Sequence, residues 1–149
     1  MKKPLEVLHL YPPHDYTLHG ALASRASRGP QRPFILFDGR TWTWQAFDEE
    51  ARKTAWLLIE RGVTKGDRVG VIGRNSDGHV LMLFAAAHIG AIVVPVNPEF
   101  GVQEARYVMH HAEVSGVVAS GDTLAVAREA CEGLETDTPL PEGEGRFET

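Results

Sequence analysis

The stretch His88-Ile89-Gly90-Ala91-Ile92-Val93-Val94-Pro95-Val96-Asn97-Pro98 decides the fold. Gly90 interrupts the helical pattern before it, and a short apolar run over 91–96 follows. Asn97-Pro98 is a turn signal that stops this run. We therefore predict a helix that ends near Gly90, a strand over 91–96, and a turn directly after it.

Segments on both sides of this stretch repeat the same alternation of strands and helices. Short apolar runs at 68–73 and 116–119 read as further strands, and the first has the composition of a strand buried on both faces. Amphipathic or apolar helices are expected over 76–90, 102–112 and 122–132. Strands that alternate with helices of this length predict an α/β fold, with a mostly parallel sheet flanked by helices.

The region before residue 62 predicts a helix, a β-hairpin and a second helix. Leu18, Ala21, Leu22 and Ala26 recur at helical spacing over 17–28. Strands at 34–37 and 41–44 flank Asp38-Gly39, a strong signal for a two-residue hairpin turn. Thr43 is a suitable N-cap for the next helix, whose inner stripe is Phe47, Ala51, Ala55 and Leu58. We expect all three tryptophans, Trp42, Trp44 and Trp56, in the core.

Composition bounds the class of protein. The chain has 149 residues, a net charge of −5 and 43% hydrophobic residues, which is typical of a globular domain. The negative charge argues against nucleic-acid binding, and no apolar run approaches the roughly 18 residues of a membrane span. With the single cysteine, Cys131, these features predict a cytoplasmic protein. We divide the chain into an N-terminal extension (1–16), an α/β part (17–132) and an acidic tail rich in proline and glycine (133–149).

Asn97, Pro98 and Glu99 are the candidate ligand-binding residues. They follow the carboxyl end of a predicted parallel strand, where open α/β sheets place their ligand sites, although a turn that merely stops the strand explains them as well. Ser120-Gly121-Asp122-Thr123 superficially suggests a phosphate loop, but a helix N-cap explains it better. His88, His110 and His111 read as structural or surface residues, with His88 hydrogen-bonded, and we predict no metal site.

Four local signatures resemble the N-terminal region of the adenylate-forming superfamily. Gly39-Arg40-Thr41-Trp42-Thr43-Trp44 is similar to its hairpin, and Gly62-Val63-Thr64-Lys65-Gly66-Asp67-Arg68-Val69 is similar to its next turn and strand. Asn75-Ser76 stands where the family usually has the same pair. The opening stretch, 88–98, resembles the most specific signature of the set. The succession covers about 17–132 in the proper order.

The resemblance implies the first part of the large domain of an ATP-dependent acyl-CoA synthetase. Such enzymes form an acyl-adenylate from a small-molecule carboxylate and ATP, and then an acyl-CoA, using Mg²⁺, as in fatty acid metabolism. The family's phosphate loop is rich in glycine and hydroxyl residues and ends in a lysine. No such loop, and no counterpart of the family's catalytic lysine, occurs at any of the four lysines, Lys2, Lys3, Lys53 and Lys65. We therefore expect a fragment that is inactive alone and needs no cofactor by itself, while its parent enzyme uses ATP, Mg²⁺ and CoA.

Asn97 and Phe100-Gly101 resemble the acyl- and aryl-CoA ligases more than the adenylation domains of peptide synthetases, which remain an alternative. A non-catalytic remnant or interaction module is another. Glu99 departs from many family members, which carry arginine there, near the phosphates of CoA. The helix over 76–90 lacks a polar face, so we expect exposed apolar surface and self-association. The resemblance implies that the pocket for the acid lies largely outside this part of the sequence, which therefore does not determine which acid is activated.

Overall fold

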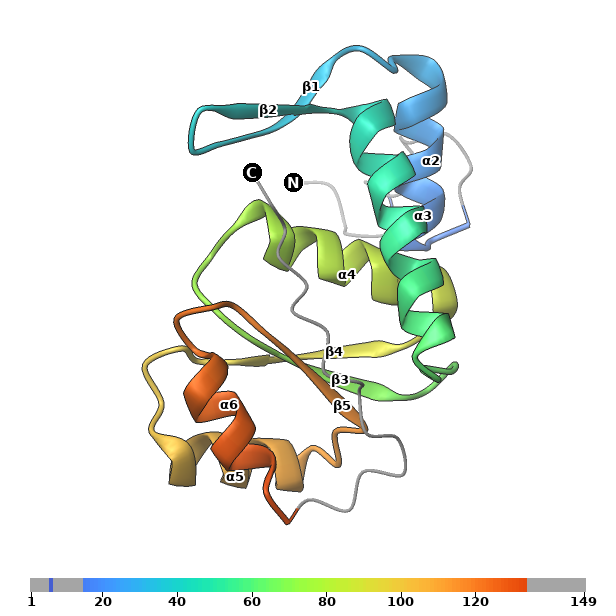
Figure 1. The fold of residues 1–149 in the computed structure, drawn as a ribbon. Coiled ribbons are helices and arrows are strands. Elements are labelled where there is room, and N and C mark those ends of the chain that lie inside the picture. Colours follow the sequence, from blue (N-terminus) through green and yellow to red (C-terminus); the bar gives the residue numbers. More distant parts are fainter. Residues whose placement is uncertain (1–5, 7–14, 134–149) are drawn as a thin grey trace.

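A computed structural model describes residue 6 and residues 15–133 (Figure 1). Its centre is a sheet of three parallel strands, β3 (Arg68–Ile72), β4 (Ile92–Val96) and β5 (Gly116–Ala119). Their order is β4-β3-β5, so the first strand in the sequence lies between the other two. The predicted α/β fold with a parallel sheet is confirmed. Most of the predicted extension and tail (1–5, 7–14 and 134–149) lies outside the described residues.

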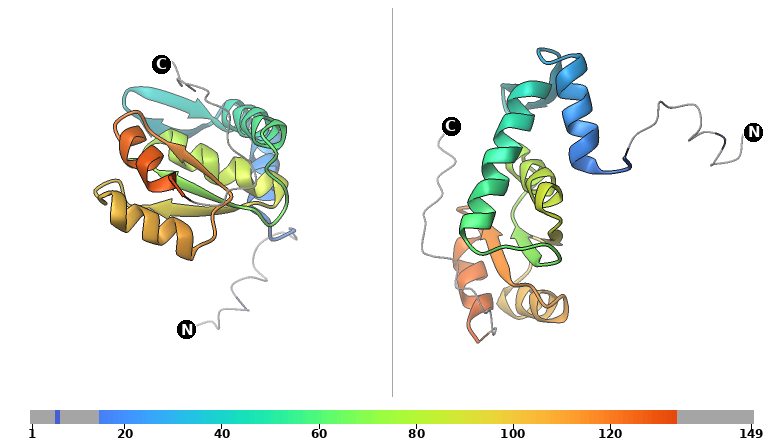
Figure 2. Two further views of the ribbon diagram at one scale, coloured as in Figure 1. Left: turned by 60° about the horizontal axis from the view of Figure 1, so that its bottom comes forward. Right: turned by 90° about the vertical axis from the view of Figure 1, so that its right-hand side faces the viewer.

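Helices cover both faces of the sheet (Figures 1 and 2). The connection from β3 to β4 runs through α4 (Asp77–Ile89), and the connection from β4 to β5 runs through α5 (Val102–His111). These two crossovers progress in opposite directions along the sheet, and right-handed connections then place their helices on opposite faces. Accordingly, α4 and α3 (Trp44–Glu60) lie on one face, and α5 and α6 (Leu124–Cys131) lie on the other.

β3 is buried on both faces, as its sequence predicts. Val69 and Val71 point into a core shared with Leu58 of α3 and Met82 of α4. Ile72 points the other way, into a second core that α5 and α6 complete. Because successive side chains of a strand face opposite sides of the sheet, one apolar strand joins two separate cores.

The hairpin has the predicted turn. β1 (Pro33–Phe37) pairs antiparallel with β2 (Arg40–Thr43), and Asp38 and Gly39 both have positive φ, 46° and 75°. Two positive values at adjacent positions fit the type I′ turn that Asp-Gly favours. The following Thr43 side chain accepts a hydrogen bond of 3.2 Å from the N–H of Ala46, so the predicted N-cap of α3 is confirmed.

Aromatic side chains join the hairpin to the helices. Phe34 of β1 stacks on Trp44 at a centroid distance of 3.8 Å and meets Phe47 of α3 and Phe84 of α4 edge-on. Phe47 is fully buried. This cluster covers the side of α4 that faces away from the sheet, so α4 is covered on more than one side by elements of this chain. Among the large apolar side chains of α4, Leu83 is the exposed one.

In α2 (Leu18–Arg28), Leu22 is buried and His19 and Ala26 are half-buried, whereas Leu18 and Ala21 are exposed. One prediction of burial, that of Trp56, is wrong. Trp56 is 61% exposed, because it lies on the outer side of α3, away from the stripe of Ala51, Ala55 and Leu58. Within the described residues, no helix has the length and apolar character needed to cross a bilayer.

Candidate functional site

The carboxyl ends of the three parallel strands form the candidate site. After β3 the chain turns toward α4, whereas after β4 and β5 it turns toward the opposite face. Neighbouring loops that leave the sheet in opposite directions open a crevice, which is where open α/β sheets bind ligands. The topology of this small sheet therefore places such a crevice at the end of β3.

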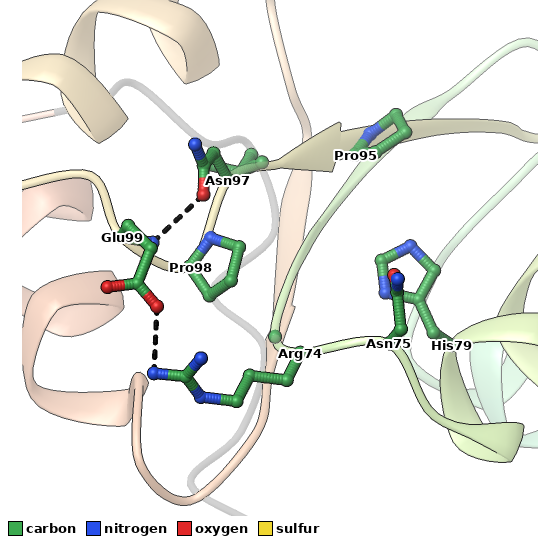
Figure 3. Close-up of a pocket in the computed structure, with 9 residues that line it drawn as sticks. Arg74, Asn75, His79, Pro95, Asn97, Pro98 and Glu99 are labelled. Carbon is green, nitrogen blue, oxygen red and sulfur yellow. Dashed lines mark hydrogen bonds and ion pairs between the residues drawn. The ribbon is translucent and has the colours of Figure 1, made fainter.

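A cleft of about 570 Å³ occupies this position (Figure 3). Its volume lies in the usual range for small-molecule sites. Its lining comes from the loop after β3, the start of α4, and the end of β4 with its turn, and consists of Gly73, Arg74, Asn75, His79, Pro95, Val96, Asn97, Pro98 and Glu99. The three candidate residues from the sequence, Asn97, Pro98 and Glu99, all line this cleft.

Asn97, Pro98 and Glu99 also form the turn that the alternative interpretation expects. The Asn97 side-chain Oδ1 accepts a hydrogen bond of 3.0 Å from the Glu99 N–H, and the Asn97 carbonyl accepts one of 3.1 Å from the Phe100 N–H. Asparagine and proline both favour such a turn. The two interpretations are compatible, because the turn fixes the backbone that carries Glu99 to the cleft.

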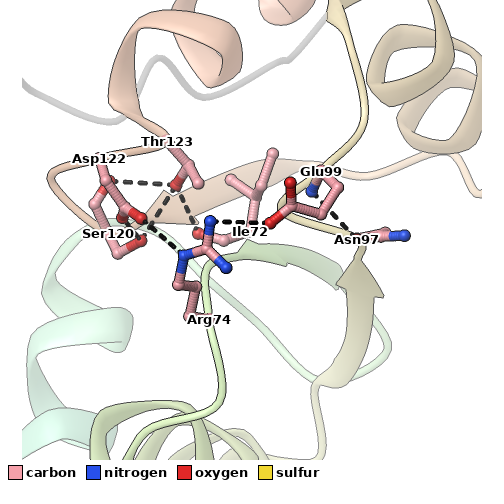
Figure 4. Close-up of polar contacts among 7 residues, drawn as sticks. All are labelled: Ile72, Arg74, Asn97, Glu99, Ser120, Asp122 and Thr123. Carbon is pink, nitrogen blue, oxygen red and sulfur yellow. Dashed lines mark hydrogen bonds and ion pairs between the residues drawn. The ribbon is translucent and has the colours of Figure 1, made fainter.

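Arg74 connects the loops that follow all three strands (Figure 4). Its Nη2 lies 2.7 Å from Oε1 of Glu99, which follows β4, and its Nε lies 3.5 Å from Oδ2 of Asp122, which follows β5. A hydrogen bond from the Ser120 hydroxyl, helped by the charge of Arg74, holds the pKa of Asp122 below its usual value. Glu99 therefore does not present an isolated negative charge, as its sequence position alone suggests, but is paired with Arg74.

The ends of β3 and β5 approach each other closely beside this arginine. A Cβ on Gly73 would lie 2.9 Å from Ser120 Oγ, a distance that real Cβ atoms do not show. The buried Thr123 hydroxyl lies 2.9 Å from the Ile72 carbonyl and 3.0 Å from the Ser120 carbonyl, so its one proton has two acceptors. Glycine at 73 thus permits the contact that brings Asp122 within reach of Arg74.

The loop 120–123 corrects one detail of the sequence interpretation. Thr123 occupies the N-cap position of α6, as expected for a helix start, but its side chain makes no capping hydrogen bond. The hydroxyl instead holds the loop to the end of β3. Because Asp122 is drawn toward Arg74, the loop belongs to the same polar arrangement as Glu99, a role that the local sequence does not indicate.

Sequence reasoning missed Arg74, Asn75 and His79. The signal was available, because Arg74 follows a predicted buried strand at the position where ligand sites form. His79 lies in the first turns of α4, and its buried Nδ1 has no hydrogen-bond partner among the described residues. Arg74 is the one cationic side chain that lines this cleft in the described part of the chain.

The other histidines that the structure describes, and the cysteine, lie outside this cleft. His110 and His111 are exposed on α5, and residues 6 and 15–133 contain no group of three potential metal ligands. The buried Nε2 of His88 has no hydrogen-bond partner among the described residues, in contrast to the expectation for this side chain, and its ring lies 5.4 Å from that of His19. Cys131 is half-buried in α6, and burial raises the pKa of its thiol.

The sequence from residue 22 to residue 145 matches the model of a family described as "AMP-binding enzyme". The chain belongs to this family of adenylate-forming enzymes. Within the family it matches the N-terminal region of the acyl-CoA ligase branch. A mitochondrial medium-chain acyl-CoA ligase of Danio rerio is 31% identical over 139 residues, which are 89% of this chain.

A structure of a long-chain-fatty-acid CoA ligase from Rhodopseudomonas palustris superposes with a TM-score of 0.78, at 30% identity over 83% of this chain. Bacitracin synthase 1 of Bacillus licheniformis is 33% identical over 61% of the chain. The chain spans 23% of the Danio rerio ligase, 31% of the Rhodopseudomonas palustris protein and 2% of the bacitracin synthase. These AMP-binding relatives are thus far longer than the part described here.

Proposed function

We propose that this chain forms part of an ATP-dependent carboxylic acid:CoA ligase. Such an enzyme joins a carboxylate to the α-phosphate of ATP, with release of pyrophosphate, and then transfers the acyl group to the thiol of CoA, with release of AMP. The observation that carries the proposal is a ligand-sized cleft at the carboxyl ends of parallel strands in a member of the AMP-binding family. The acyl-CoA ligases among its relatives support this branch.

The proposed role of the chain is to form one wall of the site that binds CoA, the acceptor of the acyl group, rather than to supply the catalytic residues. Asn97 and Pro98 fix the turn after β4, and Glu99 and Arg74 set the charge of the cleft. In this proposal ATP and CoA are substrates of the complete enzyme. A cytoplasmic location and the division into segments 1–16, 17–132 and 133–149 belong to the same proposal.

Magnesium accompanies ATP in the proposed reaction, but the described residues do not fit a Mg²⁺ site. Mg²⁺ prefers several oxygen ligands in an octahedral arrangement. Residues 6 and 15–133 bring no three carboxylate, histidine or cysteine groups together for a metal. Glu99, which lines the cleft, and Asp122 are both paired with Arg74. We assign no step to the ion in this chain.

Pyrophosphate exchange tests the proposal in two stages. The complete protein, expressed from its gene, should exchange labelled pyrophosphate into ATP when a suitable carboxylic acid is present, and should form a thioester when CoA is added. The isolated 149-residue chain should show neither activity, because its lysines include none that closes a phosphate loop. A complete protein that is inert toward a broad panel of acids would instead favour a non-catalytic remnant.

The peptide-synthetase relatives favour a second candidate function, amino-acid adenylation. The two candidates differ in both the acid and the acceptor. If amino acids support exchange, and the activated group passes to the phosphopantetheine arm of a carrier domain but not to free CoA, the chain derives from an adenylation domain. Exchange with fatty or aryl acids followed by CoA thioester formation identifies the ligase.

A further inference from the structure

We propose that Arg74 is the oxyanion-binding residue of the cleft and that Glu99 competes with the ligand for its guanidinium group. The ligand class is a small molecule that carries a phosphate or carboxylate group. The inference rests on the proposed function only in treating the cleft as a ligand site, and its test requires no catalytic turnover.

The guanidinium of Arg74 is well placed to bind an anion. Its side chain is 69% exposed at the end of β3, and it lines the cleft. Arginine offers five N–H donors in a planar arrangement that matches the oxygens of carboxylate and phosphate. Glu99 contacts Nη2 and Asp122 contacts Nε, so the two carboxylates already occupy positions that an oxyanion would take.

The two carboxylates are not held equally. Asp122 also accepts a hydrogen bond from the Ser120 hydroxyl, so its carboxylate has a second partner. Glu99 is fixed through its backbone N–H, which donates to Asn97, whereas its carboxylate is held by Arg74 in the structure. Its side chain is 66% exposed. Exposed ion pairs of this kind contribute little free energy, so the Glu99 carboxylate can leave Arg74 without displacing the turn.

The charge balance sets the direction of the effect. One guanidinium faces two carboxylates, so the group carries a net charge of about −1 with Glu99 present and about 0 without it. The structure therefore predicts weak anion binding in the native chain and stronger binding once the Glu99 charge is removed. Asp122, with its additional partner, remains on the other side of Arg74 in both states.

Inorganic phosphate and acetate are the probes, titrated separately into the 149-residue chain at low ionic strength. Binding is followed by NMR, through the Nε–H resonance of Arg74 and the amide resonances of residues 73–75. We expect Glu99→Gln to tighten phosphate binding by roughly five-fold, and added salt to reduce the gain. The gain in affinity from Glu99→Gln should be larger for phosphate than for acetate, because phosphate carries more negative charge at neutral pH.

Two further variants make the result specific. Arg74→Gln combined with Glu99→Gln should abolish the gain. Glu113→Gln is the matched control, because it frees Arg68, an arginine paired with one glutamate (Nη1–Oε2 3.0 Å) at the other end of β3 and outside the cleft. Glu113→Gln should leave phosphate binding unchanged.

The inference is overturned if Glu99→Gln fails to tighten binding in a folded chain, or if Glu113→Gln tightens it equally. Glu99→Asp provides a second measurement should Glu99→Gln not fold. It keeps the charge but shortens the side chain that reaches Arg74, so it should still tighten phosphate binding relative to the native chain, by less than about five-fold, and no gain would also overturn the inference. A complete protein that fails the pyrophosphate-exchange test, while Glu99→Gln gains phosphate affinity, would reject the proposed reaction and leave this inference standing.

Discussion

The carboxylate of Asp77 accepts a hydrogen bond of 2.7 Å from the indole N–H of Trp42, which precedes it by 35 positions in the sequence. Asp77 is buried at the first turn of α4, and Trp42 lies on β2. Arg40 of the same strand adds a contact of 3.2 Å. The negative charge also suits the positive end of the α4 dipole. One carboxylate therefore attaches the hairpin to the first turn of α4.

Asp77→Ala should destabilise the chain by about 2–3 kcal/mol, because it leaves the Trp42 and Arg40 donors without their acceptor. The free energy of unfolding in urea, followed by tryptophan fluorescence, measures this loss. Glu113→Ala, which removes the exposed pair with Arg68, should cost less than about 1 kcal/mol. Equal losses in the two variants would mean that the Asp77 contacts do not hold the hairpin.

Stability should fall as the pH drops below about 6.5, through His88. Burial of its ring, with the nearby His19 of α2, lowers the pKa of His88 below its usual 6.5, while Asp48 of α3 opposes and Arg52 of α3 adds to the shift. The unfolded chain then binds this proton more readily than the folded chain. His88 therefore contributes stability above pH 6.5 that is lost as the pH falls toward its folded value.

Urea unfolding between about pH 7.5 and pH 5.5, together with an NMR titration of the imidazole resonances, checks this sign. His88→Gln cannot titrate and should flatten the dependence on pH in this window. His19→Gln removes one of the charges that disfavour protonation, so it should raise the pKa of His88 and reduce the slope. A wild-type stability that rises toward pH 5.5 would show that attraction to Asp48 dominates.

In the complete enzyme, Glu99→Arg should lower the KM for CoA by about five-fold and leave the KM for ATP unchanged. The substitution removes a negative charge, adds a positive one and releases Arg74 from its closest partner. The gain should shrink with dephospho-CoA, which lacks the 3′-phosphate, and with added salt. Identical effects on CoA and dephospho-CoA would show that this phosphate is not what the cleft senses.

We expect the isolated chain to self-associate through exposed apolar side chains. α4 contributes less to this surface than its sequence suggests, whereas Leu36 and Trp56 are 75% and 61% exposed. Light scattering over a concentration series should show growth in mass, and Trp56→Lys should reduce it. A monomer at every concentration, with no binding of an apolar dye, would contradict the expectation.

Much of the fold is predictable because it depends on local signals. The Asp38-Gly39 turn, the Thr43 cap and the apolar run of β3 each act over a few residues, and the structure confirms all three. The inner face of α2 was not predictable in this way. His19 lies inward because it meets His88 across a helix interface, and no local pattern encodes that meeting.

The candidate site was predictable in part for the same reason. Asn97, Pro98 and Glu99 follow one strand and carry a recognisable turn signal. Their partners Arg74 and Asp122 follow two other strands, so they meet Glu99 only when the sheet forms in the order β4-β3-β5. A turn within one segment can be predicted from that segment alone, but a contact among three loops can be predicted only when the order of the strands in the sheet is known.

The central position of β3 has a consequence for how the sheet can assemble while the chain is being synthesised. Synthesis proceeds from the amino terminus, and domains begin to form as they emerge. β3 appears before β4 and β5, and these two later strands join its opposite edges. Each newly made strand can therefore add to a free edge without separating strands that are already paired, which lets the sheet grow in the same order in which it is translated.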